Sequence, residues 1–211
     1  MSVLEEMSTF MQKGRAPKVK ELVQQALDEG IAPQQILEEG LLSGMNIIGE
    51  KFKNNEVFVP EVLIAARAMN AGIEVLKPAL LASGVEAKGK VVIGTVKGDL
   101  HDIGKNLVRM MIEGKGFTVV DLGVDVSPEQ FYEAAVAENA QVVCCSALLT
   151  TTMNEMKNVV DIFKEKGMRD KVKIMVGGAP VTQNFCDSVG ADCYTADAAS
   201  AAEAALALCQ G

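Results

Sequence analysis

The sequence of 211 residues contains a single histidine, His101, no tryptophan and only two tyrosines. With one imidazole and no pair of cysteines at C-x-x-C spacing, the chain does not readily assemble a four-ligand structural zinc site. Its five cysteines are an odd number in apolar or small-residue surroundings, which predicts reduced, buried thiols. The scarcity of aromatic rings leaves little surface for base stacking or for binding a sugar.

Basic charge and long apolar runs are also scarce. The formal net charge is -8 and the isoelectric point is about 4.8, which argues against binding to nucleic acid or to anionic membranes. No apolar run approaches the roughly 20 residues of a membrane span, and residues 1–10 lack the pattern of a signal peptide. We therefore expect a cytoplasmic protein whose partners are proteins or small molecules, with no nucleic acid and no membrane among them.

The two halves of the chain differ in their hydrophobic period. Residues 1 to about 84 repeat apolar side chains at helical spacing, which predicts a small antiparallel helical bundle as a first domain, residues 1–88. Gly30 followed by Pro33 predicts the end of a second helix and the start of a third. A short connection at 84–90 then leads into a second domain, residues 89–211.

The second half alternates short β-branched runs with amphipathic stretches. Five strands are expected at 90–96, 117–123, 141–148, 171–178 and 191–196, with helices at 104–115, 128–139, 152–167, 181–189 and 198–209. Continuous apolar strands joined by helices predict an α/β fold with a parallel sheet covered on both faces. Five such units match the flavodoxin-like, doubly wound Rossmann-like order, in which ligands lie outside the carboxyl ends of the strands.

Polar and glycine-rich segments follow three of the expected strands. The residues that we expect along this edge are Gly98, Asp99, His101 and Gly104 after the first strand, Ser146, Leu148, Thr150 and Thr152 after the third, and Gly177 and Gly178 after the fourth. Such an edge suits a large, mostly neutral ligand that lies close to the backbone. Turn and capping chemistry also explains most of these residues when each is taken singly.

His101 is the residue that discriminates between functions. A lone histidine is more often structural than a ligand, but Asp99 two positions earlier can accept the proton of one ring nitrogen and leave the other directed toward a metal. A hydroxyl of Thr152 or Ser146 can donate to the aspartate in turn. The chain lacks the G-x-S-x-G elbow of a hydrolase and the G-x-G-x-x-G turn of a nicotinamide enzyme.

Three spaced elements together resemble the signature of cobalamin-binding domains. D-L-H-D-I-G at 99–104, S-A-L at 146–148 and G-G at 177–178 match the pattern D-x-H-x-x-G, S-x-L and G-G. Residues 44–69 resemble the helical cap that precedes this domain in methionine synthase and in corrinoid proteins of methyltransferase systems. The resemblance covers nearly the whole chain and implies a free-standing corrinoid protein of the methylamine, methanol or betaine type.

The resemblance also implies a role for each matched residue. His101 would replace the cofactor's dimethylbenzimidazole as the lower cobalt ligand, with Asp99 and then Thr152 as a hydrogen-bonded relay, where methionine synthase has a serine in the last place. Phe58 and Val62 would shield the upper face of the cofactor, although their spacing also suits a bundle core. The remaining residues implied to border the cofactor are Gly98, Asp102, Ile103, Gly104, Ser146, Leu148, Thr150, Gly177 and Gly178.

The function implied by the resemblance is methyl carriage by a subunit that is not an enzyme on its own. Cobalt would alternate between Co(I) and methyl-Co(III), with methylcobalamin and hydroxocobalamin as bound states. The implied partners are a substrate-specific methyltransferase, a second methyltransferase with tetrahydrofolate or coenzyme M as acceptor, and a reductive activase. Two alternatives stay open: a cobalamin-dependent sensor, which usually adds a basic DNA-binding segment, and the small subunit of a cobalamin-dependent mutase, which needs a barrel partner.

Overall fold

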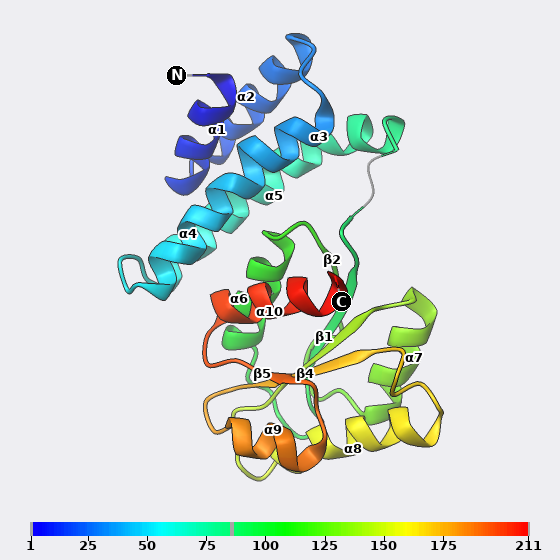
Figure 1. Ribbon diagram of the computed structural model, residues 1–211. Helices are drawn as coiled ribbons and strands as arrows, with labels where there is room; N and C mark the ends of the chain where they lie inside the picture. The colour runs from blue at the N-terminus through cyan, green and yellow to red at the C-terminus, as the bar shows by residue number, and fades with distance from the viewer. Residues whose placement is uncertain (1, 85–86, 211) are drawn as a thin grey trace. The chain divides into compact units, whose positions relative to one another are not determined.

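The computed structural model describes residues 2–84 and 87–210 and forms two compact units. The first comprises Met1–Ala87 together with Gly114–Gly116, and the second comprises Lys88–Glu113 together with Phe117–Gly211. Helices alone build residues 2–84, drawn from blue to cyan-green in Figure 1, whereas the second unit contains a sheet and five helices among its described residues. Each unit is built around its own set of buried side chains.

The helical unit follows the predicted amphipathic pattern. Its elements are α1 (Val3–Gln12), α2 (Ala16–Asp28), α3 (Pro33–Gln35), the π-helix η1 (Ile36–Leu42), α4 (Ser43–Lys53) and α5 (Val59–Ala82). A capping box opens α1, because Ser2 Oγ accepts from the backbone N–H of Glu5 while the Glu5 carboxylate accepts from that of Ser2. Apolar side chains from all the longer helices form the core: Met7, Met11, Val19, Leu22, Val23, Ile36, Leu41, Met45, Ile48, Val62, Met69 and Leu76.

The third helix expected from the sequence, which starts near Pro33, contains a π-helical segment that was not predicted. The apolar period from 36 to 52 predicts one regular helix, but residues 36–42 form a π-helix that continues into α4. The π-helix lies close to α1: a Cβ on its Gly40 would lie 2.6 Å from Met7 Sδ. Hydrophobic periodicity over one or two turns does not distinguish a π-helix from an α-helix.

The second unit has the predicted parallel sheet. Its strands are β1 (Lys90–Thr95), β2 (Thr118–Asp121), β3 (Val142–Ser146), β4 (Lys173–Gly177) and β5 (Cys193–Tyr194). They lie in the order β2-β1-β3-β4-β5, and every neighbouring pair is parallel. This is the flavodoxin-like order, so the predicted fold class is confirmed.

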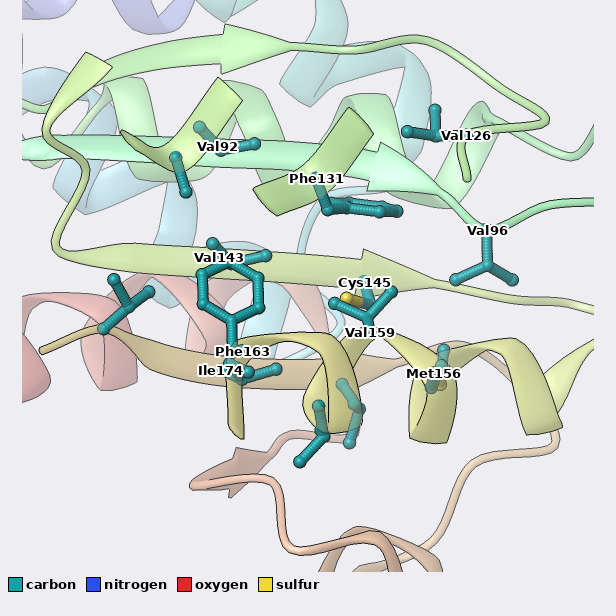
Figure 2. Packing of buried hydrophobic residues seen from close by; sticks show 14 of the residues in the cluster. Val92, Val96, Val126, Phe131, Val143, Cys145, Met156, Val159, Phe163 and Ile174 are labelled. Carbon is teal, nitrogen blue, oxygen red and sulfur yellow. The ribbon is translucent and has the colours of Figure 1, made fainter. Parts of the chain in front are cut away.

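Helices cover both faces of the sheet, which explains why the strands are apolar throughout. The helices are α6 (Ile103–Glu113), α7 (Pro128–Glu138), α8 (Met153–Glu165), α9 (Gln183–Val189) and α10 (Ala198–Gln210). Figure 2 shows one face, where Phe131 of α7 and Phe163 of α8 pack over Val92 and Val143. Because side chains alternate along a strand, Val91 and its equivalents face the opposite layer, in which α6 packs against α10.

The register brings the carboxyl ends of three strands to one edge. Thr95 of β1 lies opposite Ser146 of β3, and Ser146 lies opposite Gly177 of β4. The chain order reverses between β1 and β3, because β2 lies on one side of β1 and β3 on the other. In open parallel sheets this switch point is where the loops part and a ligand can enter.

Candidate functional site

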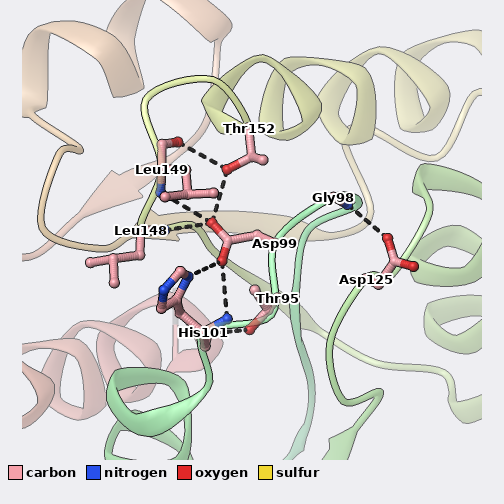
Figure 3. A network of polar contacts seen from close by, with 8 residues as sticks. All are labelled: Thr95, Gly98, Asp99, His101, Asp125, Leu148, Leu149 and Thr152. Atoms are coloured by element: carbon pink, nitrogen blue, oxygen red, sulfur yellow. Dashed lines mark hydrogen bonds and ion pairs between the residues drawn. The ribbon is translucent and has the colours of Figure 1, made fainter.

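Asp99 lies at the centre of the edge that the loops after β1 and β3 share. Its side chain is fully buried, and both oxygens accept hydrogen bonds. Oδ1 accepts from the backbone N–H of His101 at 3.0 Å and contacts His101 Nδ1 at 2.7 Å. Oδ2 accepts from the backbone N–H groups of Leu148 at 2.8 Å and Leu149 at 3.1 Å, and from the hydroxyl of Thr152 at 2.9 Å (Figure 3).

These donors keep Asp99 ionised. Burial acts to raise the pKa of its carboxyl, but the hydrogen bonds from the backbone of His101 and Leu148, from the imidazole and from the backbone of Leu149 outweigh it and hold the pKa far below its ordinary value. A carboxylate has no proton to donate, so the proton in its contact with the neutral ring lies on Nδ1 of His101. The lone pair of the ring then lies on Nε2.

The His101 side chain is 51% exposed, although its carboxylate partner is not exposed at all. The ring therefore projects from the loop while its inner nitrogen is fixed by Asp99. A neutral imidazole with one nitrogen donating to a carboxylate and the other exposed has the arrangement of a metal-ligating histidine.

The hydroxyl of Thr152 contacts the Asp99 carboxylate and does not cap the helix that it precedes. Thr152 occupies the N-cap position of α8, where a threonine side chain ordinarily accepts from the first turn, yet it makes no such bond. Its hydroxyl lies 2.9 Å from Asp99 Oδ2 and 2.9 Å from the carbonyl oxygen of Leu149. Of the two hydroxyls considered from the sequence, this is the one that reaches the aspartate.

Two residues that the sequence did not single out hold the backbone of the same loop. The hydroxyl of Thr95, which is fully buried, donates to the carbonyl oxygen of His101 at 3.0 Å. Asp125 accepts from the backbone N–H of Gly98 at 2.7 Å through Oδ1. Thr95 reads as an ordinary strand residue and Asp125 lies 26 positions after Asp99, so no local signal identifies either.

The glycines of the predicted site differ in what they do. A Cβ on Gly104 or Gly177 would meet no atom within 4 Å, so both border open space at the strand ends. A Cβ on Gly178 would lie 1.9 Å from the carbonyl oxygen of Ala147, and its φ is +130°. Gly178 is thus required by the approach of two backbones, whereas Gly104 and Gly177 leave room for a ligand.

Large apolar side chains are exposed in the same two loops. Leu100 is 71% exposed, Ile103 77%, Leu148 44% and Leu149 41%. Ile103 and Leu148 belong to the predicted set, whereas Leu100 and Leu149 were missed. The sequence pattern that could have identified Leu100 and Leu149 is an apolar residue next to a polar residue shortly after a predicted strand. Exposed apolar residues around a polar centre are typical of a site that a large ligand covers.

Three further predicted residues lie nearby in the chain. Asp102 precedes α6, and its carboxylate accepts from the side-chain amide of Asn106 at 3.0 Å. Ser146 is half-buried at the end of β3, and Thr150 is exposed in the turn that follows. Contact of these residues with a cofactor stays a prediction.

Phe58 and Val62 belong to the helical unit. Phe58 is the N-cap of α5 and is 64% exposed, whereas Val62 is fully buried in the bundle core. The burial of Val62 favours the packing role that the sequence left open for it. The predicted shielding role of Phe58 agrees with its exposure and stays a prediction.

The remaining donor groups of the chain do not form a metal site by themselves. Within the part of the chain that the structure describes, no three His, Cys, Asp or Glu residues are grouped so that they could hold a metal ion. All five cysteines are free, and burial raises the pKa of the Cys144 thiol to about 12, so that it stays protonated. The prediction of reduced, buried thiols holds for three of the five, since Cys193 and Cys209 are half-buried.

Comparison with known proteins identifies the class. Residues 89–207 match a family described as B12 binding domain, and residues 3–77 match a second family with the same description. The chain therefore belongs to the B12-binding corrinoid proteins, and a corrinoid such as cobalamin is its cofactor.

Its relatives include proteins named for methylamines and methanol. The chain is 43% identical over 211 residues to dimethylamine corrinoid protein 2 of Methanosarcina acetivorans, covering 99% of this chain and 97% of the relative. It is 48% identical over 176 residues, 82% of each chain, to trimethylamine corrinoid protein 1 of the same organism. It also superimposes on a chain of the methanol:cobalamin methyltransferase complex from Methanosarcina barkeri with a TM-score of 0.89 and 33% identity, covering 99% of this chain and 80% of that one. Among the described residues, no helix is long and apolar enough to cross a membrane.

The chemistry of the site fits a corrinoid. The chain offers a single exposed imidazole nitrogen as a donor, so a metal bound there must bring most of its ligands with it, as the cobalt of a corrin ring does. The exposed leucines of the two loops offer apolar surface for a macrocycle. Gly104 and Gly177 leave the strand ends open where a bulky side chain would fill them.

Proposed function

We propose that this chain is a methyl carrier that holds cobalamin through Nε2 of His101, with the cofactor's own base displaced. The observation that carries the proposal is the contact between His101 Nδ1 and the buried Asp99 carboxylate, which leaves Nε2 as the nitrogen available to a metal on a half-exposed side chain. When bound, reduced cobalt supplies a nucleophile that accepts a methyl group and later releases it.

The residues of the chain control the imidazole. Asp99 holds the proton on Nδ1, and Thr152 donates to the opposite oxygen of the same carboxylate. If the imidazole were released from a bound metal, Nε2 would be free to accept a proton, and the adjacent carboxylate would stabilise the positive charge. The loop would therefore couple proton uptake at Nε2 to release of the ligand.

The other predicted residues surround the displaced part of the cofactor. Gly104 and Gly177 leave space at the ends of the strands. The residues that would border the cofactor beside them are Gly98, Asp102, Ile103, Ser146, Leu148, Thr150 and Gly178. In this proposal residues 1–88 act as a cap, in which Phe58 shields the upper face, and residues 89–211 bind the cofactor.

We propose that the chain works with separate enzymes in the cytoplasm. A substrate-specific methyltransferase would deliver the methyl group, and a second would pass it to tetrahydrofolate or coenzyme M. A reductive activase would restore oxidised cobalt. The names of the relatives support a methylated amine or methanol as the donor.

The proposal is tested by loading the chain with hydroxocobalamin and recording its visible spectrum. Wild-type protein should give the spectrum of cobalamin with a histidine in place of its own base, and the His101→Ala variant should give that of cobalamin without a nitrogen base. The loaded protein is then reduced and mixed in turn with each methylamine or methanol, together with the methyltransferase that is specific for that donor. Identical spectra for the two proteins would contradict ligation by His101, and failure of every donor to methylate the cofactor would contradict the carrier role.

A further inference from the structure

Asp125 adopts a backbone conformation that residues other than glycine rarely adopt. It lies in the turn between β2 and α7 with φ of +55°, in the left-handed region. For an L-residue this conformation is unfavourable by about 1–2 kcal/mol, although aspartate and asparagine tolerate it best. Asp125 is exposed, so packing into the core does not explain why the turn keeps it. Such a conformation persists where the surrounding contacts determine it.

The left-handed conformation directs two polar groups of Asp125 toward the loop that carries His101. Its Oδ1 accepts from the backbone N–H of Gly98 at 2.7 Å, and its own N–H donates to the carbonyl oxygen of Asp99 at 3.0 Å. The next residue, Val126, donates to the carbonyl oxygen of Thr95 at 3.0 Å. Figure 3 shows the Asp125 side chain directed at Gly98, on the side of the loop away from the imidazole.

Gly98 is the point at which this loop turns. Its φ is +80°, and the next residue is the carboxylate that fixes the imidazole. A shift of Gly98 therefore moves Asp99, and the contacts of Asp99 carry the shift to His101. The bond from Gly98 to Asp125 Oδ1 is the side-chain contact that holds this turn from outside the loop.

We propose that Asp125 is a positioning residue that fixes the turn at Gly98 and, through Asp99, the direction of the His101 ring. Its hydrogen bonds go to the backbone of Gly98 and Asp99 rather than to the imidazole, so it acts through the loop. The importance of the ring direction rests on the proposed function, in which Nε2 of His101 is the lower ligand.

Two substitutions separate the side chain of Asp125 from its backbone. Asp125→Gly keeps the left-handed conformation at no steric cost and removes the acceptor of the Gly98 N–H. Asp125→Asn keeps an oxygen acceptor and tolerates the same conformation, so it is the matched control. Urea unfolding of both variants checks that the global fold is retained.

The first measurements use the full chain without cofactor. In the Asp125→Gly variant, the amide hydrogen of Gly98 should exchange about tenfold faster than in wild type, since it loses one hydrogen bond. The nitrogen signals of the histidine, which is unique in the chain, should broaden or double as the ring samples more than one direction. The Asp125→Asn variant should match wild type in both respects.

The second measurement uses the cobalamin-loaded chain. The fraction of cofactor with the histidine-bound spectrum should fall in Asp125→Gly and stay at the wild-type level in Asp125→Asn. If Asp125→Gly shows the imidazole signals and the visible spectrum of wild type, the proposal is overturned. Fast hydrogen exchange at the Gly98 amide of the wild-type protein would also overturn it, and that measurement does not depend on the folding of any variant. If wild-type protein itself lacks the histidine-bound spectrum, the proposed function fails, while the signals of the unloaded protein still decide the role of Asp125.

Discussion

Replacing Asp99 by asparagine should invert the proton positions on the His101 ring. The carboxylate accepts from the His101 backbone and ring on one oxygen, and from three further donors on the other. An asparagine amide has the same shape, but only one of its ends accepts. It must therefore present its NH₂ group to one of these two sets of donors.

The energies decide which way the amide turns. A buried donor left without an acceptor costs about 1–3 kcal/mol, so facing the NH₂ toward the backbone N–H groups of Leu148 and Leu149 costs about 2–6 kcal/mol. The Thr152 hydroxyl adds nothing to this cost, because it can donate to the carbonyl oxygen of Leu149. Facing it toward His101 leaves only the backbone N–H without an acceptor, because the neutral ring can change its tautomer. The remaining bonds also weaken, since they no longer involve a charge. We expect Asp99→Asn to be less stable than wild type by about 3 kcal/mol, with the amide oxygen toward α8.

In that orientation the NH₂ group donates to Nδ1 of His101, so the ring proton moves to Nε2. The exposed nitrogen then has no lone pair for a metal, and the variant should lose the histidine-bound cobalamin spectrum although it retains the histidine. Long-range proton–nitrogen NMR correlation on histidine-labelled protein without cofactor, at about pH 8 where a free imidazole is neutral, reads the tautomer directly. A proton on Nε2 in the wild-type ring, or one that stays on Nδ1 in the variant, would refute this reasoning.

Three further predictions use the same contacts. Thr152→Val should lower the free energy of unfolding by about 1–2 kcal/mol in urea titrations through loss of one buried hydrogen bond, whereas Thr152→Ser should restore it; equal loss in both would assign the effect to packing. Gly178→Ala should lower the free energy of unfolding by about 3 kcal/mol or more, because the added Cβ would lie 1.9 Å from the Ala147 carbonyl oxygen. Gly177→Ala should fold normally and weaken cobalamin binding. A Gly177→Ala variant less stable than Gly178→Ala would contradict the geometry. Because folding lowers the pKa of Asp99, the contribution of this group to stability is complete above the unfolded pKa of about 3.9 and is lost as the pH falls from there toward the folded pKa. Asp99→Asn should therefore reduce the slope of stability against pH in this range. An unchanged slope would show that other groups produce it.

The sequence predicts the sheet well because several independent signals agree there. Apolar β-branched runs, helical crossovers of ordinary length and polar residues at the strand ends all indicate one parallel order. The strands are shorter than predicted, as β2 occupies only Thr118–Asp121, because the apolar pattern continues into the turns. In the helical unit the same periodicity could not reveal the π-helix at Ile36–Leu42, since one residue more per turn changes the pattern little over so short a segment.

The candidate site also contains residues that were predicted from the sequence and residues that were not. His101, Asp99 and Thr152 were predicted together, and the structure brings their side chains into contact. Thr95 and Asp125 were missed because their role depends on which turn faces the loop, and chain separation hides that. The polar spacing in the sequence identifies the groups proposed to hold a ligand. The groups that contact the backbone of the loop are recognised only in the structure, where the turn after β2 lies beside the end of β1.

The most direct test of the central claim is electron paramagnetic resonance of the cobalamin-loaded chain in the Co(II) state, prepared with ordinary and with ¹⁵N-labelled histidine. Since the chain has a single histidine, the label marks a single ring. If Nε2 of His101 is the lower ligand, each cobalt line splits as a triplet with ¹⁴N and as a doublet with ¹⁵N. A triplet that persists after labelling would mean that the cofactor keeps its own base, and lines without nitrogen splitting would mean that no imidazole binds the cobalt.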